Sequence, residues 1–268
     1  MISSRHVHDI RPRKDHRGIA WHNTRIVRAF AVSLIALLSI VDLAKLQAAE
    51  PRFRPALIGN GPKALVNLID TEKLMEKGER DALLMFMCRV SRSGQAGGPN
   101  IPRQTPGSKL LEEELGLALG KCRFIPAIYN GKRTDVTFSG TVLFMVIDGK
   151  PHLRIYANQS RDDVNKGNDF IVPQVVEDTV DYAGIKWDLA AEKAMVYHQA
   201  GRIDLSIAVD ANGNQKDMKV ILEDPPGFGY GEIARKAYAK TKWIPGFRNG
   251  RAVDCSFEYS TWFRPGSP

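Results

Sequence analysis

Few side chains in this 268-residue sequence have the types and spacing that chemistry requires. Four of the six histidines precede residue 50, which leaves His152 and His198, and no histidine lies near a cysteine in a zinc-binding pattern. The glycine-rich stretch Gly227–Gly231 lacks the Lys-Ser or Lys-Thr that follows in a P-loop, and no G-x-S-x-G or H-E-x-x-H motif is present. We therefore expect neither an enzyme nor a bound metal or cofactor.

The three cysteines allow two interpretations. Cys88 and Cys122 fall in the same part of the chain, so an oxidising compartment could join them in a disulfide and leave Cys255 single. Alternatively, all three are buried thiols that behave as small apolar side chains. The sequence leaves both possibilities open.

The positive charge is concentrated in the first 49 residues. The whole chain carries 38 Lys and Arg against 30 Asp and Glu, and residues 1–49 hold eight of these cations and three of these anions. The remainder therefore has 30 against 27, a net charge of only +3. This balance gives no reason to expect nucleic-acid binding.

Residues 1–49 have the composition of an export leader. A basic stretch precedes thirteen uncharged residues, Ala29 to Val41, and Asp42 ends this run. A membrane-spanning helix needs about 20 apolar residues, so the run favours a cleaved secretory signal. The alternatives are an uncleaved membrane anchor and a buried helix of a soluble protein. On the first two interpretations the globular part works outside the cytoplasm.

An internal repeat organises the rest of the chain. With an offset of 119 residues and no gap, Lys121–Phe144 aligns with Lys240–Phe263 and is identical at eight of 24 positions. Average residue usage would give roughly one or two identities by chance. The same offset places Gly94 on Gly213, each at the end of a strand-like run. A period of this length indicates two copies of a domain rather than a solenoid.

Each copy is expected to contain a small antiparallel sheet with a helix on one face. In the second copy the apolar residues of 203–209 alternate with polar ones, which is typical of a half-buried strand. Residues 230–238 instead carry apolar side chains at helical spacing. The sequence therefore predicts an α+β fold with domains at 50–158 and 175–268, joined by a linker at 159–174.

A shared motif links the helix to the last strand in both copies. An aromatic residue precedes Ile-Pro, which favours extended backbone, and Asn-Gly follows as a tight-turn signal. A large ring at such a junction can seal the sheet against the helix. The motif residues are Phe124, Pro126, Asn130 and Gly131 in the first copy and Trp243, Pro245, Asn249 and Gly250 in the second.

The second copy resembles the C-terminal domain of the TonB family, the periplasmic part of the energy transducers that serve outer-membrane receptors. The resemblance covers Gly201–Phe263 well and Leu83–Phe144 loosely. It rests on the glycine before the first strand, the "VD..G" turn, the small-residue helix, the "W.P" junction and "NG..V" before the last strand. It implies two tandem TonB C-terminal-like domains in an exported, periplasmic protein.

The resemblance also implies a site. In this family a receptor adds its TonB-box strand to the edge formed by the last strand, which corresponds here to Arg251–Phe263. Strand addition of this kind takes its affinity from unpaired backbone N–H and C=O groups. The expected pairing residues are Val253, Asp254, Cys255, Ser256 and Phe257.

Two functions follow from the resemblance. The first is strand-addition binding of an outer-membrane receptor, coupled to TonB-dependent transport, with ExbB/ExbD-type partners if the leader stays as an inner-membrane anchor. The alternative is a cell-envelope binding or scaffold module that binds another envelope protein and transduces no energy. A transducer of this family has a long proline-rich span, whereas residues 42–62 contain only Pro51, Pro55 and Pro62.

Overall fold

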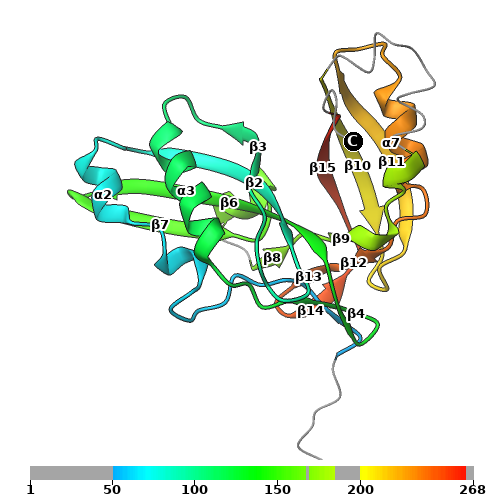
Figure 1. The fold of residues 1–268 in the computed structure, drawn as a ribbon, viewed down its shortest axis with the longest axis horizontal. Coiled ribbons are helices and arrows are strands. Elements are labelled where there is room, and N and C mark those ends of the chain that lie inside the picture. Colours follow the sequence, from blue (N-terminus) through cyan, green and yellow to red (C-terminus); the bar gives the residue numbers. More distant parts are fainter. Residues whose placement is uncertain (1–50, 167–168, 185–199, 264–268) are drawn as a thin grey trace, which may run out of the picture. The chain divides into compact units, whose positions relative to one another are not determined.

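The computed structural model describes residues 51–166, 169–184 and 200–263, so the leader lies outside the described residues. The fold is mixed α+β, with antiparallel sheets and few helices (Figure 1). None of the helices in the described ranges is long and apolar enough to cross a membrane.

The first repeat is built on two long strands, β2 (Ala82–Val90) and β6 (Val136–Ile147), which pair antiparallel along the full length of β2. β3 (Asn100–Gln104) pairs with the other side of β2, and β7 (Lys150–Tyr156) pairs with β6. Helix α3 (Lys109–Lys121) covers this sheet (Figure 1). Its buried residues are Leu111, Leu115, Ala118 and Leu119.

The second repeat is a three-stranded antiparallel sheet in the order β11-β10-β15. β10 (Gly201–Val209) is the central strand, between β11 (Gln215–Asp224) and β15 (Cys255–Phe263). Helix α7 (Tyr230–Tyr238) packs against this sheet with most of its residues buried. The strand and helix expected from the spacing of apolar residues at 203–209 and 230–238 are both present.

The offset of 119 residues also relates the strand pairing of the two repeats. In the first repeat Ala82 pairs with Phe144 and Val90 pairs with Val136. In the second, Gly201 pairs with Phe263 and Val209 pairs with Cys255. Adding 119 to each residue of the first pairs gives the second pairs, so the two central sheets share one register.

A glycine and an aromatic residue meet in the same way in both repeats. Gly94 and Gly213 have positive φ values of 80° and 76°. A Cβ atom on either glycine would lie 2.2 Å from the carbonyl oxygen of Phe124 or Trp243 respectively, so only glycine fits this approach. Phe124 and Trp243 are buried at these junctions, as the sequence motif predicts.

The Asn-Gly turns lie in two short hairpins. β4 (Ala127–Tyr129) and β5 (Lys132–Thr134) flank the first turn, and β13 (Gly246–Arg248) and β14 (Arg251–Val253) flank the second. Both asparagines and both glycines adopt positive φ, as expected for such turns.

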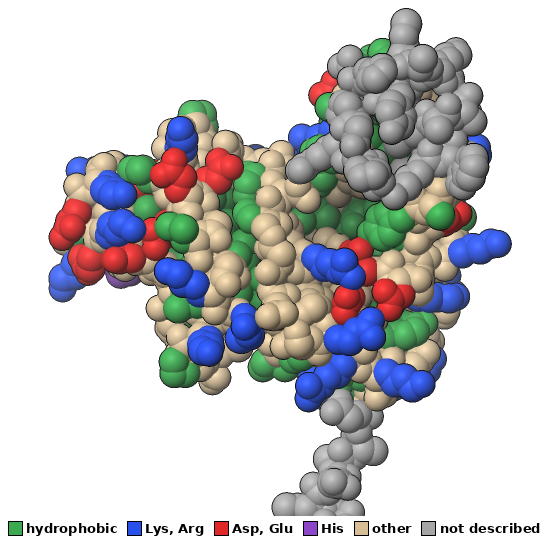
Figure 2. All heavy atoms as spheres, viewed as in Figure 1, with side chains coloured by type: hydrophobic (Ala, Val, Ile, Leu, Met, Phe, Trp, Pro, Cys, Tyr) green, Lys and Arg blue, Asp and Glu red, His purple; other side chains and the backbone are tan. Residues whose placement is uncertain are grey.

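β1 (Phe53–Arg54) pairs with β4, and Lys and Arg side chains gather near the point where the described chain begins (Figure 2).

The expected linker at 159–174 is not a linker in the structure. It contains helix α4 (Arg161–Lys166), β8 (Phe170–Ile171) and the first residue of β9 (Gln174–Val176). The reason is burial: the side chains of Phe170 and Val172 belong to the apolar core of the second repeat. Short apolar runs between polar residues give no periodic signal for these elements.

One sheet contains strands from both repeats. β12 (Trp243–Ile244) pairs with β9, and β9 pairs with β6, which gives a six-stranded sheet in the order β12-β9-β6-β2-β3, with β7 also paired to β6. Ile244 belongs to the core of the first repeat, whereas Met87 belongs to that of the second. Residues 50–268 therefore form one compact unit rather than two separate domains.

The remaining elements are η1 (Leu65–Asn67), α2 (Thr71–Glu76) and η2 (Glu177–Thr179).

The turn that follows β10 is organised by Asp210. Its carboxylate accepts hydrogen bonds from the backbone N–H groups of Asn212 and Asn214, each at 2.9 Å, and from the Lys216 ammonium at 2.8 Å. The Lys216 hydrogen bond, followed by those from Asn214, holds the pKa of Asp210 well below its ordinary value. Folding is therefore linked to ionisation of this side chain.

We expect Asp210→Asn to weaken the acid sensitivity of folding. Because the folded state depresses the pKa of Asp210, its contribution to stability is complete above the unfolded value, about 3.9, and is lost as the pH falls toward the lower folded value. The wild type should lose more unfolding free energy than the variant between about pH 5 and pH 2 in urea titrations. Asp217→Asn, at an exposed position of β11, is the control and should follow the wild type. Parallel pH profiles for wild type and Asp210→Asn would contradict this assignment.

Candidate functional site: the outer edge of strand β15

One face of β15 fixes the strand in the second sheet. Phe257 and Tyr259 are buried, and their rings meet Trp243 edge-on at centroid distances of 5.4 and 5.7 Å. Ser256 and Glu258 lie on the opposite face and are exposed. Exposed and buried side chains therefore alternate from Ser256 to Tyr259, and the aromatic side chains anchor the strand.

Among the described residues, β15 is an edge strand. It pairs with β10 along its whole length, from Cys255 to Phe263. Within the described ranges no other strand pairs with it, and no further backbone hydrogen bond reaches it from a loop. The outward N–H and C=O groups of such a strand are available for pairing with another extended chain.

The counterpart of β15 in the first repeat is paired on both sides. β6 pairs with β2 on its inner side, and on its outer side with β9 at Val136–Thr137 and with β7 at Thr141–Ile147. With the offset of 119 residues, these outer positions correspond to residues 255–256 and 260–266. The chain thus adds antiparallel strands to β6 where no described strand pairs with β15.

A groove of about 610 Å³ opens beside β15, within the size range of ligand-binding pockets. One side consists of β15 and β10, and the other consists of β2, β3, β6 and the segment that follows β7. Most of its polar lining comes from small or uncharged side chains. These are Ser139, Gln159 and Ser160 from the first repeat and Ser206, Ser256 and Ser260 from the second.

An ion pair connects the two sides of the groove. The Arg103 guanidinium on β3 lies 2.8 Å from the Glu258 carboxylate and 3.8 Å from the Asp204 carboxylate. Asp204 is buried and also accepts hydrogen bonds at 2.6 Å from Arg202 and from the Ser260 hydroxyl. Because the side chains of Arg103 and Glu258 are about half exposed, their pairing adds little stability. A ligand can therefore separate this pair at low cost.

The structure divides the five predicted pairing residues between two sheets. Val253 ends β14 and pairs with Gly246, and Asp254 lies between β14 and β15. The Asp254 carboxylate accepts a hydrogen bond from the Ala211 N–H at 2.7 Å, so it holds the turn after β10. Asp135, at the matching position of the first repeat, accepts one from the Arg92 N–H at 2.8 Å. Only Cys255, Ser256 and Phe257 lie on β15, together with the residues up to Phe263.

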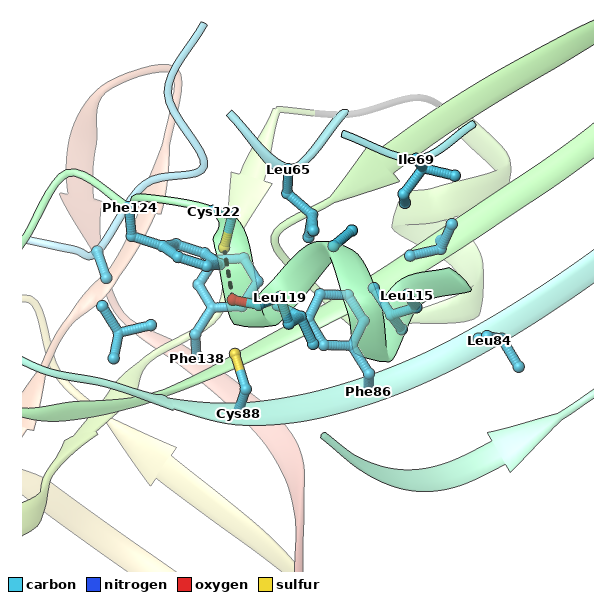
Figure 3. Close-up of a cluster of buried hydrophobic side chains, with 14 of the residues drawn as sticks. Leu65, Ile69, Leu84, Phe86, Cys88, Leu115, Leu119, Cys122, Phe124 and Phe138 are labelled. Carbon is cyan, nitrogen blue, oxygen red and sulfur yellow. Dashed lines mark hydrogen bonds between the residues drawn. The ribbon is translucent and has the colours of Figure 1, made fainter. Parts of the chain in front are cut away.

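The cysteines are free thiols in the structure. Cys88 on β2 and Cys122 after α3 are buried in the same apolar cluster, and the Cys122 thiol donates a hydrogen bond to the Leu119 carbonyl at 3.4 Å (Figure 3). Burial raises the pKa of Cys122 to about 11 and that of half-buried Cys255 to about 11. The structure therefore has no disulfide between Cys88 and Cys122. The thiols serve as apolar packing groups.

The described part of the chain contains no cluster of three or more His, Cys, Asp or Glu side chains that could hold a metal ion. Several residues that line the groove were not predicted as site residues from the sequence. Arg103 lies on β3, and Gln159 and Ser160 lie in the expected linker. No periodicity or motif marks these positions, because they form a site only when two repeats pack together.

No family model and no curated protein sequence matches this chain.

Proposed function

We propose that this protein binds a partner polypeptide by strand addition along the outer edge of β15, from Cys255 to Phe263. One observation carries the proposal: β15 has a partner on one side only among the described residues, whereas its counterpart β6 has strands on both sides. The first repeat thus serves as an internal template for an augmented sheet.

The template suggests the orientation of the partner. β7 and β9 both run antiparallel to β6, so the added strand is expected to run antiparallel to β15. Its backbone would supply the affinity, and alternate side chains would enter the groove beside Ser206 and Ser256. Small hydroxyl side chains there accept varied residues and hydrogen-bond to polar ones.

Together with the sequence resemblance, this edge supports a TonB-like role. On this proposal the two repeats are tandem TonB C-terminal-like domains of an exported periplasmic protein. The partner is the TonB-box strand of an outer-membrane receptor, and ExbB/ExbD-type proteins join if the leader anchors the chain.

A second candidate is a cell-envelope scaffold that uses the same edge without transducing energy. The shared sheet favours it, since β12 of the second repeat pairs with β9 and so belongs to the sheet of the first. A strand-binding domain that is built into a larger rigid unit suits a stationary adaptor. Copurification of the full chain with ExbB/ExbD-type proteins would favour the transducer, and its absence would favour the scaffold.

A peptide titration tests the proposal. The full chain, labelled with ¹⁵N, is titrated with a TonB-box peptide and with unrelated extended peptides, and amide shifts are followed by NMR. Strand addition should shift the amides of Cys255–Phe263 more than those of β11, the other edge of the same sheet. Shifts confined to β11, or no shift with any peptide, would contradict the proposal.

Two matched substitutions locate the binding edge. Ser206→Trp on β10 fills the groove and should weaken peptide binding at least about tenfold, since a bulky ring occupies the space that the partner's side chains would enter. Lys219→Trp is the control, because Lys219 is the cross-strand neighbour of Ser206 on β11 and does not line the groove. Equal affinity of both variants would argue against the β15 edge.

A further inference from the structure

Two segments of the first repeat, Pro51–Lys63 and Lys121–Arg133, carry Lys and Arg but no Asp or Glu. They run side by side and antiparallel: Phe53 pairs with Tyr129, Leu57 bridges to Ile125, and the Arg123 N–H donates to the Lys63 carbonyl at 2.9 Å. Together they form a surface that we call the basic strip. Its cations are Arg52, Arg54, Lys63, Lys121, Arg123, Lys132 and Arg133.

No acidic side chain in the described part of the chain forms an ion pair with any cation of the basic strip. Six of the seven are exposed, and Arg54 is half-buried with its guanidinium on the Pro126 carbonyl at 3.1 Å. Arg89 and Arg92, by contrast, both pair with Asp135. The strip therefore keeps its positive charge available for an external anion.

Apolar groups accompany these cations. Phe53 and Tyr129 pack with ring centroids 5.5 Å apart, and the Arg52 guanidinium lies 4.8 Å from the centre of the Phe53 ring. Ile125, between Arg123 and Lys132 in sequence, is 39% exposed. Aromatic and aliphatic groups among cations are typical of surfaces that meet the headgroup region of a bilayer.

The membrane-anchor interpretation of the leader would also place the strip near a bilayer. Only residues 42–51 separate the uncharged run Ala29–Val41 from Arg52, and a connection of this length spans at most about 40 Å. Insertion of that run into a membrane would keep the strip close to the same membrane. A negatively charged leaflet attracts basic residues within roughly a Debye length, about 8–10 Å.

We infer that the basic strip docks the folded unit on an anionic phospholipid surface. The charged guanidinium and ammonium groups meet lipid phosphates, and the exposed Ile125 side chain contacts the outer part of the acyl region. This inference is independent of strand addition at β15, because β15 contributes none of these residues.

Vesicle partitioning of the full chain tests the inference. Wild type is compared with Arg123→Gln/Lys132→Gln/Arg133→Gln on vesicles of phosphatidylcholine alone and of phosphatidylcholine with about 30% phosphatidylglycerol, at about 0.15 M salt. Each basic residue at such a surface is worth about a fivefold change in partitioning. The triple variant should therefore bind anionic vesicles at least about tenfold more weakly.

The matched control removes three exposed cations elsewhere, with Lys77→Gln/Arg80→Gln/Lys150→Gln at the end of α2, in the loop after it and in the β6–β7 hairpin. It should partition like the wild type. Equal partitioning of the two triple variants, or equal binding of wild type to both kinds of vesicle, would overturn the inference. Loss of duplex DNA binding in the strip variant with unchanged vesicle binding would overturn it in favour of a nucleic-acid surface. Unchanged urea denaturation of both variants excludes unfolding as the cause.

Discussion

Replacing Trp243 with alanine is expected to lower the free energy of unfolding by about 3–5 kcal/mol. The side chain is fully buried between helix α7 and the second sheet, where it meets the rings of Phe257 and Tyr259. Its indole N–H also donates to the Gln215 side-chain oxygen at 3.1 Å, so the substitution leaves both a cavity and an unpaired acceptor. Urea denaturation followed by circular dichroism measures the loss.

The control for this prediction is Leu117→Ala, at a leucine of α3 that is 56% exposed, which should change stability by about 0.5 kcal/mol or less. Because Trp243 holds the rings of β15, Trp243→Ala should also weaken peptide binding at the outer edge. A loss of stability no larger than that of the control would show that the junction is not a core element.

Gly213→Ala is expected to be nearly as severe, at about 3 kcal/mol or more. Two costs add: the residue has a φ of +76°, which is strained for alanine by about 1–2 kcal/mol, and its new Cβ would lie 2.2 Å from the Trp243 carbonyl oxygen. Since the contact is with backbone, it cannot be relieved by rotating a side chain.

Gly250→Ala separates these two costs. Gly250 has a similar φ of +73°, but a Cβ atom added to it would meet no atom within 4 Å, so only the conformational cost of about 1–2 kcal/mol applies. Thermal or urea unfolding of both variants measures the difference. Equal destabilisation would mean that the close approach of Gly213 to Trp243 contributes nothing.

The sequence is most informative where one physical requirement fixes one residue. The alternation in β10 predicts a half-buried strand, and the Asn-Gly pairs predict tight turns with positive φ, because few other residues tolerate that backbone. The aromatic residues before Ile-Pro are expected at the helix-to-sheet junction, and Phe124 and Trp243 are buried there.

Other features depend on contacts between distant segments and could not be predicted. β9 has only three residues, and it forms because Val175 pairs with Trp243 and Val176 with Val136. The family resemblance implies a partner-binding edge at Asp254, yet the Asp254 carboxylate accepts a hydrogen bond from the backbone N–H of Ala211. A polar side chain that bonds to a remote turn leaves no local pattern in the sequence.

The candidate site is therefore only partly visible in the sequence. The last strand is expected to end the sheet, and β15 does so within the described residues, but nothing in the sequence predicts the groove beside it. The ion pair of Arg103 with Glu258 joins positions 155 residues apart, a separation at which a single sequence carries no pairing signal.

The short strand β12 contributes side chains to the apolar cores of both repeats. Trp243 belongs to one apolar core and Ile244, its neighbour in the sequence, belongs to the other, so two consecutive residues of one strand join the cores. Deletion of the second repeat would remove β12 from the sheet of the first and Ile244 from its core, and deletion of the first would remove Met87 from the core of the second, so neither deletion would leave an intact interior.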